Sequence, residues 1–183
     1  MNPSKNSETG QNIHKWWAVG TTATSTGPFG LWVADIQPPW PTSSKAVVGV
    51  ATLCSILSAI VALALVPTKH RRRAIAASLI VTGAILLLAY YALYSAFVVR
   101  RPQMVEGTAN MRFWVVGYIR QAAYRDNGLS DDETLERAGF DPEKAWTRGS
   151  LTAVRISLLG SYTLAFSLLT AGLAVLGTVE PPK

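Results

Sequence analysis

The stretch AVVGVATLCSILSAIVALALV, residues Ala46–Val66, contains no charged side chain, and the same is true of AIAASLIVTGAILLLAYYALYSAFVV, residues Ala74–Val99. As α-helices these segments would be about 31 Å and about 39 Å long, at 1.5 Å per residue. The hydrocarbon core of a membrane is roughly 30 Å thick. We therefore predict two transmembrane helices, which the short connection PTKHRRR (Pro67–Arg73) joins into an antiparallel hairpin.

A third uncharged run, Ile156–Thr178, predicts a final span. The expected fold class is all-α: a polytopic transmembrane helical bundle with three spans and a short amphipathic helical segment outside the membrane. Residues 13–40 are rich in Trp but interrupted by Gly, Pro and polar residues, which leaves three alternatives: an interfacial segment, a fourth span or re-entrant loop, and a small soluble hairpin. The expected segments are a polar tail with this Trp-rich part (1–45), the hairpin (46–99), an amphipathic helical connection (100–150) and the final span with a short tail (151–183).

The connection between the first two spans is basic. Its cations are Lys69, Arg71, Arg72 and Arg73. Because positive charge is retained on the cytoplasmic side of membranes, we predict that this turn is cytoplasmic. The same cations are candidates for binding anionic lipid. Arg100 and Arg101 close the second run, and their long side chains are expected to reach the headgroups on the opposite side.

The connection between the second and third spans contains helix signals. Apolar residues recur with helical spacing over Thr108–Tyr124, which predicts an amphipathic helix there. Ser130-Asp131-Asp132-Glu133 is a capping box, and the helix after it is expected to stop at Gly139. Asp141-Pro142 is typical of a helix start. That helix is predicted to continue into the last span, with a kink at Gly149.

Each predicted span carries a stripe of small residues with heptad-like spacing. Such residues let membrane helices approach closely, and Ser and Thr hydroxyls can bond across the contact. The stripes are interpreted as packing surfaces within one chain, as surfaces that meet another subunit or line a pore, or as a groove for a lipid or small ligand. Their members are Ala51, Ser55, Ser58 and Ala62 on the first span, Ser78, Thr82, Ala89, Ala92 and Ala96 on the second, and Ala153, Ser157, Gly160, Thr163, Ser167, Thr170, Ala174 and Gly177 on the last.

The composition argues against several functions. The formal net charge of +6 comes largely from residues beside the spans, so we expect no nucleic-acid binding. Cys54, inside the first span, is the only cysteine, and His14 and His70 are not at ligand spacing, so we expect no metal. The acidic residues between positions 131 and 143 are attributed to helix capping and solvation. No catalytic set or cofactor motif can be assembled, so we expect no enzyme activity and no cofactor.

These patterns predict an integral, multi-pass protein of a bacterial inner (cell) membrane. Its expected function is helix–helix assembly, as an accessory or scaffold subunit of a membrane complex. The expected partners are membrane lipid and other membrane protein subunits or a second copy of the chain. The alternative is a homo-oligomeric pore or membrane-permeabilising effector, lined by the Ser/Thr/Gly stripe of the last span.

Overall fold

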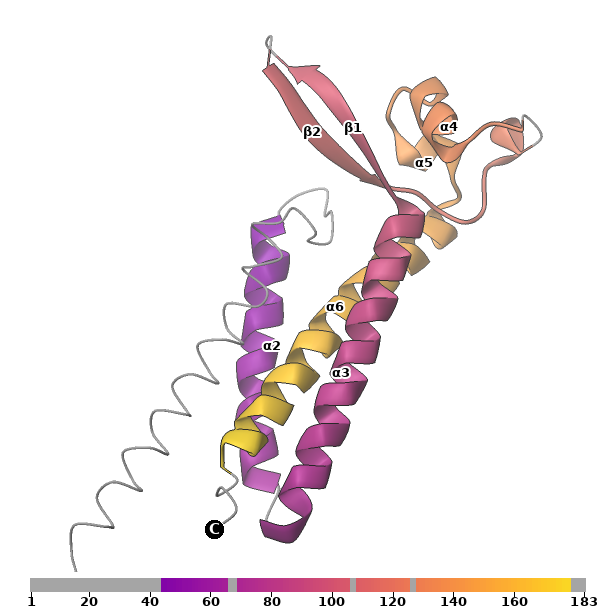
Figure 1. The fold of residues 1–183 in the computed structure, drawn as a ribbon. Coiled ribbons are helices and arrows are strands. Elements are labelled where there is room, and N and C mark those ends of the chain that lie inside the picture. The colour runs from indigo at the N-terminus through magenta and orange to yellow at the C-terminus, as the bar shows by residue number, and fades with distance from the viewer. Residues whose placement is uncertain (1–43, 66–68, 106–107, 126–127, 179–183) are drawn as a thin grey trace, which may run out of the picture. The chain divides into compact units, whose positions relative to one another are not determined.

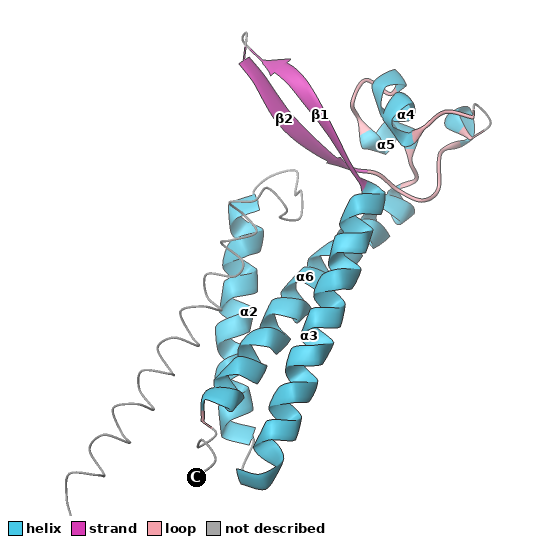
Figure 2. Ribbon diagram, viewed as in Figure 1, coloured by secondary structure: helices cyan, strands magenta, loops and turns pink. Residues whose placement is uncertain are grey.

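The computed structural model describes residues 44–65, 69–105, 108–125 and 128–178, and most of these residues are helical (Figure 1). In addition to the helices, the described residues form one antiparallel hairpin (Figure 2). The prediction of a mostly helical fold is confirmed, whereas an all-α fold is wrong because of this hairpin. The elements are α2 (Ser44–Leu65), α3 (Lys69–Phe97), β1 (Val98–Val105), β2 (Thr108–Val115), the 3₁₀ helix η1 (Ala122–Tyr124), α4 (Asp131–Arg137), α5 (Pro142–Ala145) and α6 (Arg148–Gly177).

Three helices, α2, α3 and α6, are long and apolar enough to cross a membrane. This confirms three long apolar helices in the predicted places, and their crossing of a membrane stays a prediction. The element expected N-terminal to them, and the short C-terminal tail, fall at 1–43 and 179–183, outside the described residues. Helix α6 begins at Arg148, about two turns before the predicted span, because arginine and leucine are good helix formers and a helix need not begin where the uncharged run begins.

The described chain forms two compact units. The helical unit contains residues 45–88 and 161–178, which are α2, the first part of α3 and the second part of α6. The mixed unit contains residues 89–160, which are the end of α3, the hairpin, the short helices and the start of α6.

In the helical unit, α3 and α6 are antiparallel. Gly83 of α3 lies against Leu169 and Ala165 of α6, whereas Gly172 of α6 lies against Ile80, nearer the start of α3. At both glycines a Cβ atom would come within about 3 Å of the neighbouring backbone. Close backbone approach of this kind is how helices pack in lipid, where there is no gain from burying apolar area.

Residues 108–115 form a strand, so the predicted amphipathic helix over Thr108–Tyr124 is wrong. Strand β2 pairs antiparallel with β1, with Val98 opposite Val115 and Arg101 opposite Arg112. The segment is rich in aromatic and β-branched residues, which suit a strand, and β1 supplies the hydrogen-bonding partner. The helical spacing of its apolar residues was misleading because a short apolar segment can match both the period of a helix and the period of a strand.

The mixed unit has its own hydrophobic core around Trp146, which is fully buried. Gly117 allows this packing, since a Cβ there would lie 3.0 Å from the Cβ of Trp146. The backbone of Val116 donates to the carbonyl of Phe97, which ties the hairpin to the last residue of α3. The core residues are Val116, Leu135, Ala138, Ala145, Trp146 and Leu151, with Phe97, Val99, Trp114, Tyr124 and Phe140 packed against them.

The helix signals after residue 128 are mostly confirmed. The Ser130 hydroxyl accepts from the Glu133 backbone N–H, the Glu133 carboxylate accepts from the Ser130 N–H, and α4 is followed by Gly139 at φ 69°. Asp141 caps α5. However, α5 ends at Ala145 and does not continue into α6, because residue 146 is extended and bridges to residue 120 in a short β-pairing.

Candidate functional site

The three small-residue stripes are placed differently. On α6, the members in the helical unit are largely buried: Ser167, Thr170 and Ala174 are 5–8% exposed. The Thr170 hydroxyl donates to the Phe166 carbonyl at 2.7 Å, so it is satisfied within its own helix. Thr163 is half-buried, and its Oγ1 has no partner among the described residues.

Further toward the start of α6, within the mixed unit, the stripe is more open. Ser157 is exposed, and Gly160 is half-buried with no atom within 4 Å of the position of a Cβ. On α2, Ala51 and Ser55 are buried, and Ser58 is half-buried. The Ser55 hydroxyl donates to the Ala51 carbonyl at 2.8 Å.

The stripe on α3 is exposed along its whole length. Ile85, which lies within it, is 60% exposed. A different face of α3 is buried, and it includes Ala76, Gly83 and Tyr90 at intervals of one heptad. This second face is not among the predicted stripes. The heptad spacing of an alanine, a glycine and a tyrosine is the signal that could have found it. The exposed members of the stripe are Ser78, Thr82, Ala89, Ala92 and Ala96.

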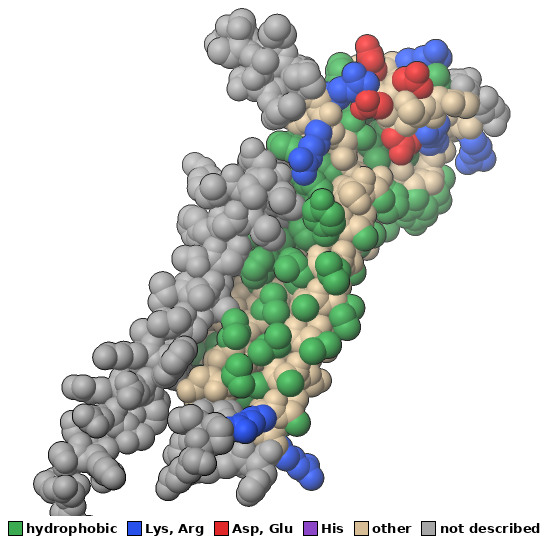
Figure 3. All heavy atoms as spheres, viewed as in Figure 1, with side chains coloured by type: hydrophobic (Ala, Val, Ile, Leu, Met, Phe, Trp, Pro, Cys, Tyr) green, Lys and Arg blue, Asp and Glu red, His purple; other side chains and the backbone are tan. Residues whose placement is uncertain are grey.

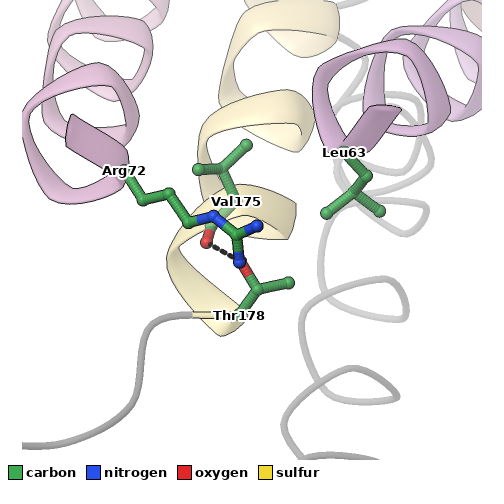
Figure 4. A pocket seen from close by; sticks show the side chains of 4 residues that line it. All are labelled: Leu63, Arg72, Val175 and Thr178. Carbon is green, nitrogen blue, oxygen red and sulfur yellow. Dashed lines mark hydrogen bonds between the residues drawn. The ribbon is translucent and has the colours of Figure 1, made fainter. Parts of the chain in front are cut away.

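The cations at the start of α3 differ in exposure. Arg71 and Arg73 are exposed, whereas Arg72 is half-buried. The Arg72 side chain reaches from α3 to the end of α6, where Nη1 donates to the Thr178 hydroxyl at 3.4 Å (Figure 4). Lys69 is the first residue of α3, and its side chain is not among those described.

A small pocket of about 50 Å³ lies beside the Arg72 guanidinium, between Leu63 of α2 and Val175 of α6 (Figure 4). Arg72 Nε is buried there without an acceptor among the described residues. The C-terminal end of a helix carries partial negative charge, so a cation at the end of α6 is favourable. Arg72 therefore links the start of α3 to the end of α6 through its contact with Thr178.

Arg100 and Arg101 do not extend from the end of a helix, because both lie in β1. The Arg100 guanidinium lies over the rings of Tyr94 and Phe113, at 5.1 and 5.4 Å from their centroids, which is a cation–π geometry. Arg101 forms an ion pair with Asp132, which raises the pKa of the Arg101 guanidinium. Helix α3 ends at Phe97, two residues before the predicted end at residue 99, because Val98 already belongs to the paired strand β1. The expectation that both side chains reach lipid headgroups stays a prediction.

Charged side chains gather on the mixed unit and at the start of α3, whereas the side chains along the helices are mainly hydrophobic (Figure 3). Arg120 pairs with Asp131 at 2.7 Å. Hydrogen bonds from Ser130 lower the pKa of the Glu133 carboxyl. Glu133 and Asp141 act as helix caps, as the capping interpretation of the acidic residues predicted.

Across the described ranges, no three His, Cys, Asp or Glu side chains come close enough together to hold a metal ion. The expectations of no metal, no cofactor and no enzyme activity stay predictions. Comparisons with protein-family models, with curated proteins and with solved structures found no match.

Proposed function

We propose that this protein is a subunit of a membrane complex and that it docks onto another transmembrane helix through the exposed stripe of α3. The observation that carries the proposal is that α3 has two small-residue faces. One face, at Ala76 and Gly83, is buried, with Gly83 packed against α6. The other, at Ser78, Thr82 and Ala89, is exposed.

Lipid tails give no reason for the exposed stripe to consist of small residues, since a leucine would suit the hydrocarbon as well. Small side chains at heptad-like spacing do favour close contact with a second helix at a crossing angle near +20°. The Ser78 and Thr82 hydroxyls, one turn apart, are suited to hydrogen bonding across such a contact. An accessory or scaffold role is proposed because docking through small side chains and hydroxyls requires no catalytic group.

The proposed arrangement in the membrane follows from α3 itself. If α3 crosses, the chain leaves the bilayer at Phe97 on the face opposite to Lys69. The basic start of α3 favours the cytoplasmic side. The hairpin and short helices would then lie on the other side, where they offer a folded surface to partner subunits. We propose a bacterial inner membrane as the location.

A pore lined by the stripe of α6 is the alternative. Its support is limited to the first part of the helix, where Ser157 is exposed. Ser167 and Thr170 are buried, and Thr170 is bonded within α6, so these hydroxyls would have to be uncovered before they could contact water. A homo-oligomer that docks through α3 would leave them covered.

Bulky substitutions on two faces of α3 test the docking proposal. Ala89→Leu and Ala92→Leu change the exposed stripe, whereas Ala77→Leu and Ala84→Leu make the same change at exposed positions on another face of the same helix. We expect the first pair to release the partner during gentle purification and the second pair to retain it. Equal behaviour of the two pairs would contradict docking through the stripe.

Cross-linking identifies the partner and separates the two candidate functions. In a Cys54→Ser background, a cysteine at Thr82 is expected to cross-link to a different membrane protein, while a cysteine at Ala84, which is exposed on another face, is not. A cross-link only between copies of this chain, together with ion flux in reconstituted liposomes that Ser167→Leu and Thr170→Leu abolish, would favour the pore instead.

A further inference from the structure

A cleft with a volume of about 320 Å³ lies in the mixed unit, between α5 and the first two turns of α6. Arg148, Thr152 and Arg155 line it from one face of α6, since their spacing of four and three residues places them on the same side of a helix. Glu143 of α5 lies opposite. Leu151, which also lines the cleft, is almost completely buried.

The charges in this cleft are only loosely paired. Arg148 Nε lies 3.9 Å from one Glu143 oxygen, and Arg155 Nη1 lies 3.8 Å from the other. Both distances exceed the length of a hydrogen bond. Two arginines against one glutamate leave an excess of positive charge. Arg155 Nε is buried and has no acceptor among the described residues, so the hydrogen-bonding capacity of this guanidinium is not used up within the described part of the chain.

The position of the cleft along α6 points to the headgroup region of a membrane. The helix has 30 residues and is about 45 Å long, at 1.5 Å per residue, whereas the hydrocarbon core is roughly 30 Å thick. Its first turns therefore extend beyond the hydrocarbon when its end lies at the other surface. Ile156, directly after Arg155, is 62% exposed, as expected where contact with lipid begins.

We propose that this cleft binds the phosphate of a phospholipid headgroup. The guanidinium groups of Arg148 and Arg155 and the hydroxyl of Thr152 donate to the phosphate oxygens, because arginine matches phosphate geometry and charge-assisted bonds are strong. Glu143 lies where it can accept from an ammonium group. The headgroup that satisfies both is zwitterionic with a primary ammonium, of the phosphoethanolamine type. This site is separate from the α3 stripe and does not depend on the proposed docking.

Native mass spectrometry of the full chain in detergent, with phosphatidylethanolamine or phosphatidylglycerol added, measures the binding. We expect Arg155→Gln to weaken phosphatidylethanolamine binding about tenfold or more, the effect of losing a hydrogen bond to a charged group. Arg155→Lys, which keeps the charge, should restore part of it. Arg137→Gln removes an exposed arginine of α4 and should change nothing. Equal losses for Arg155→Gln and Arg137→Gln would overturn the site.

Two further variants distinguish a loss of binding from misfolding and test the preference for the ethanolamine headgroup. Arg148 has a side chain that is 89% exposed, so Arg148→Gln should leave the fold intact and still weaken binding. The near-ultraviolet circular dichroism spectrum of the chain checks the fold. Glu143→Gln should lower the preference for the ethanolamine headgroup over the glycerol headgroup. An unchanged preference would overturn the role of Glu143.

Inorganic phosphate distinguishes a lipid phosphate from a free one. If the site takes lipid, inorganic phosphate alone should produce no Arg155-dependent increase in thermal stability at concentrations where the lipid does. An equal, Arg155-dependent stabilisation by inorganic phosphate would show that the ligand is a free phosphate and would overturn the lipid assignment.

Discussion

A Cβ atom on Gly172 of α6 would lie 2.7 Å from Cγ1 of Ile80 on α3, so the absence of a side chain at Gly172 is what lets the two helices approach this closely. The same Cβ would lie 3.0 Å from the Ala76 carbonyl oxygen and 3.1 Å from the Ile80 backbone nitrogen. Backbone atoms cannot move aside by changing rotamer. The contact therefore depends on glycine at this position.

Gly172→Ala is expected to lower the free energy of unfolding by roughly 1–2 kcal/mol, because overpacking outweighs the better helix propensity of alanine. Unfolding of the full chain by SDS in mixed micelles measures this change. Gly160→Ala on the same helix is the control, since no atom lies within 4 Å of its Cβ position. It should be neutral or slightly stabilising. Equal destabilisation by both variants would contradict the close-packing explanation.

Arg72→Gln is expected to lower the free energy of unfolding by about 1 kcal/mol, because it removes a cation from the C-terminal end of α6. Arg72 is half-buried and contacts Thr178, whereas Arg71 is exposed, so Arg71→Gln removes the same charge without this contact. The same SDS titration compares them. If the two variants are equally stable, Arg72 acts only as one of several basic residues that orient the helix.

The Ser130–Glu133 capping box should make α4 sensitive to acid. Hydrogen bonds from the Ser130 N–H at 2.9 Å and from its hydroxyl at 3.0 Å stabilise the Glu133 carboxylate, and the pKa of that carboxyl is lowered in the folded state. A lowered pKa means that the contribution to stability is present above the ordinary glutamate pKa and is lost as the pH falls through the folded value.

Ser130→Ala removes the hydroxyl but keeps the backbone N–H, so the pKa of Glu133 should rise part of the way toward its ordinary value. An NMR titration of the Glu133 side-chain carboxyl carbon measures it. Ser130→Thr keeps the hydroxyl and should keep the lowered pKa. A pKa of Glu133 that is the same in Ser130→Ala and in the unchanged chain would show that the hydroxyl has no part in the cap.

Single cysteines in a Cys54→Ser background test the proposed orientation. Arg71 and Glu136 are both exposed, one at the start of α3 and one on α4. In intact cells, we expect an impermeant maleimide to label Glu136→Cys, and to label Arg71→Cys only after permeabilisation. Labelling of both from the outside would contradict the crossing of α3. The reverse pattern would confirm the crossing and contradict the cytoplasmic assignment of the basic turn.

The sequence alone determined the three apolar helices, both ends of α4 and the start of α5. A long uncharged run must hydrogen-bond its own backbone in lipid, so its structure follows from its composition whatever the rest of the chain does. The capping box at Ser130 and the stop at Gly139 depend on atoms within a few residues of each other. Such features need no information from distant parts of the chain.

Only the tertiary structure decided what depends on a distant partner. Thr108–Val115 is a strand because 98–105 pairs with it, and its own apolar spacing fitted a helix equally well. Which small-residue face of α3 is buried, and which arginine reaches Thr178, depend on where α6 lies. Side-chain spacing defines the faces of a helix, but contact with another element selects the face that is covered, and that selection is not encoded in any local pattern.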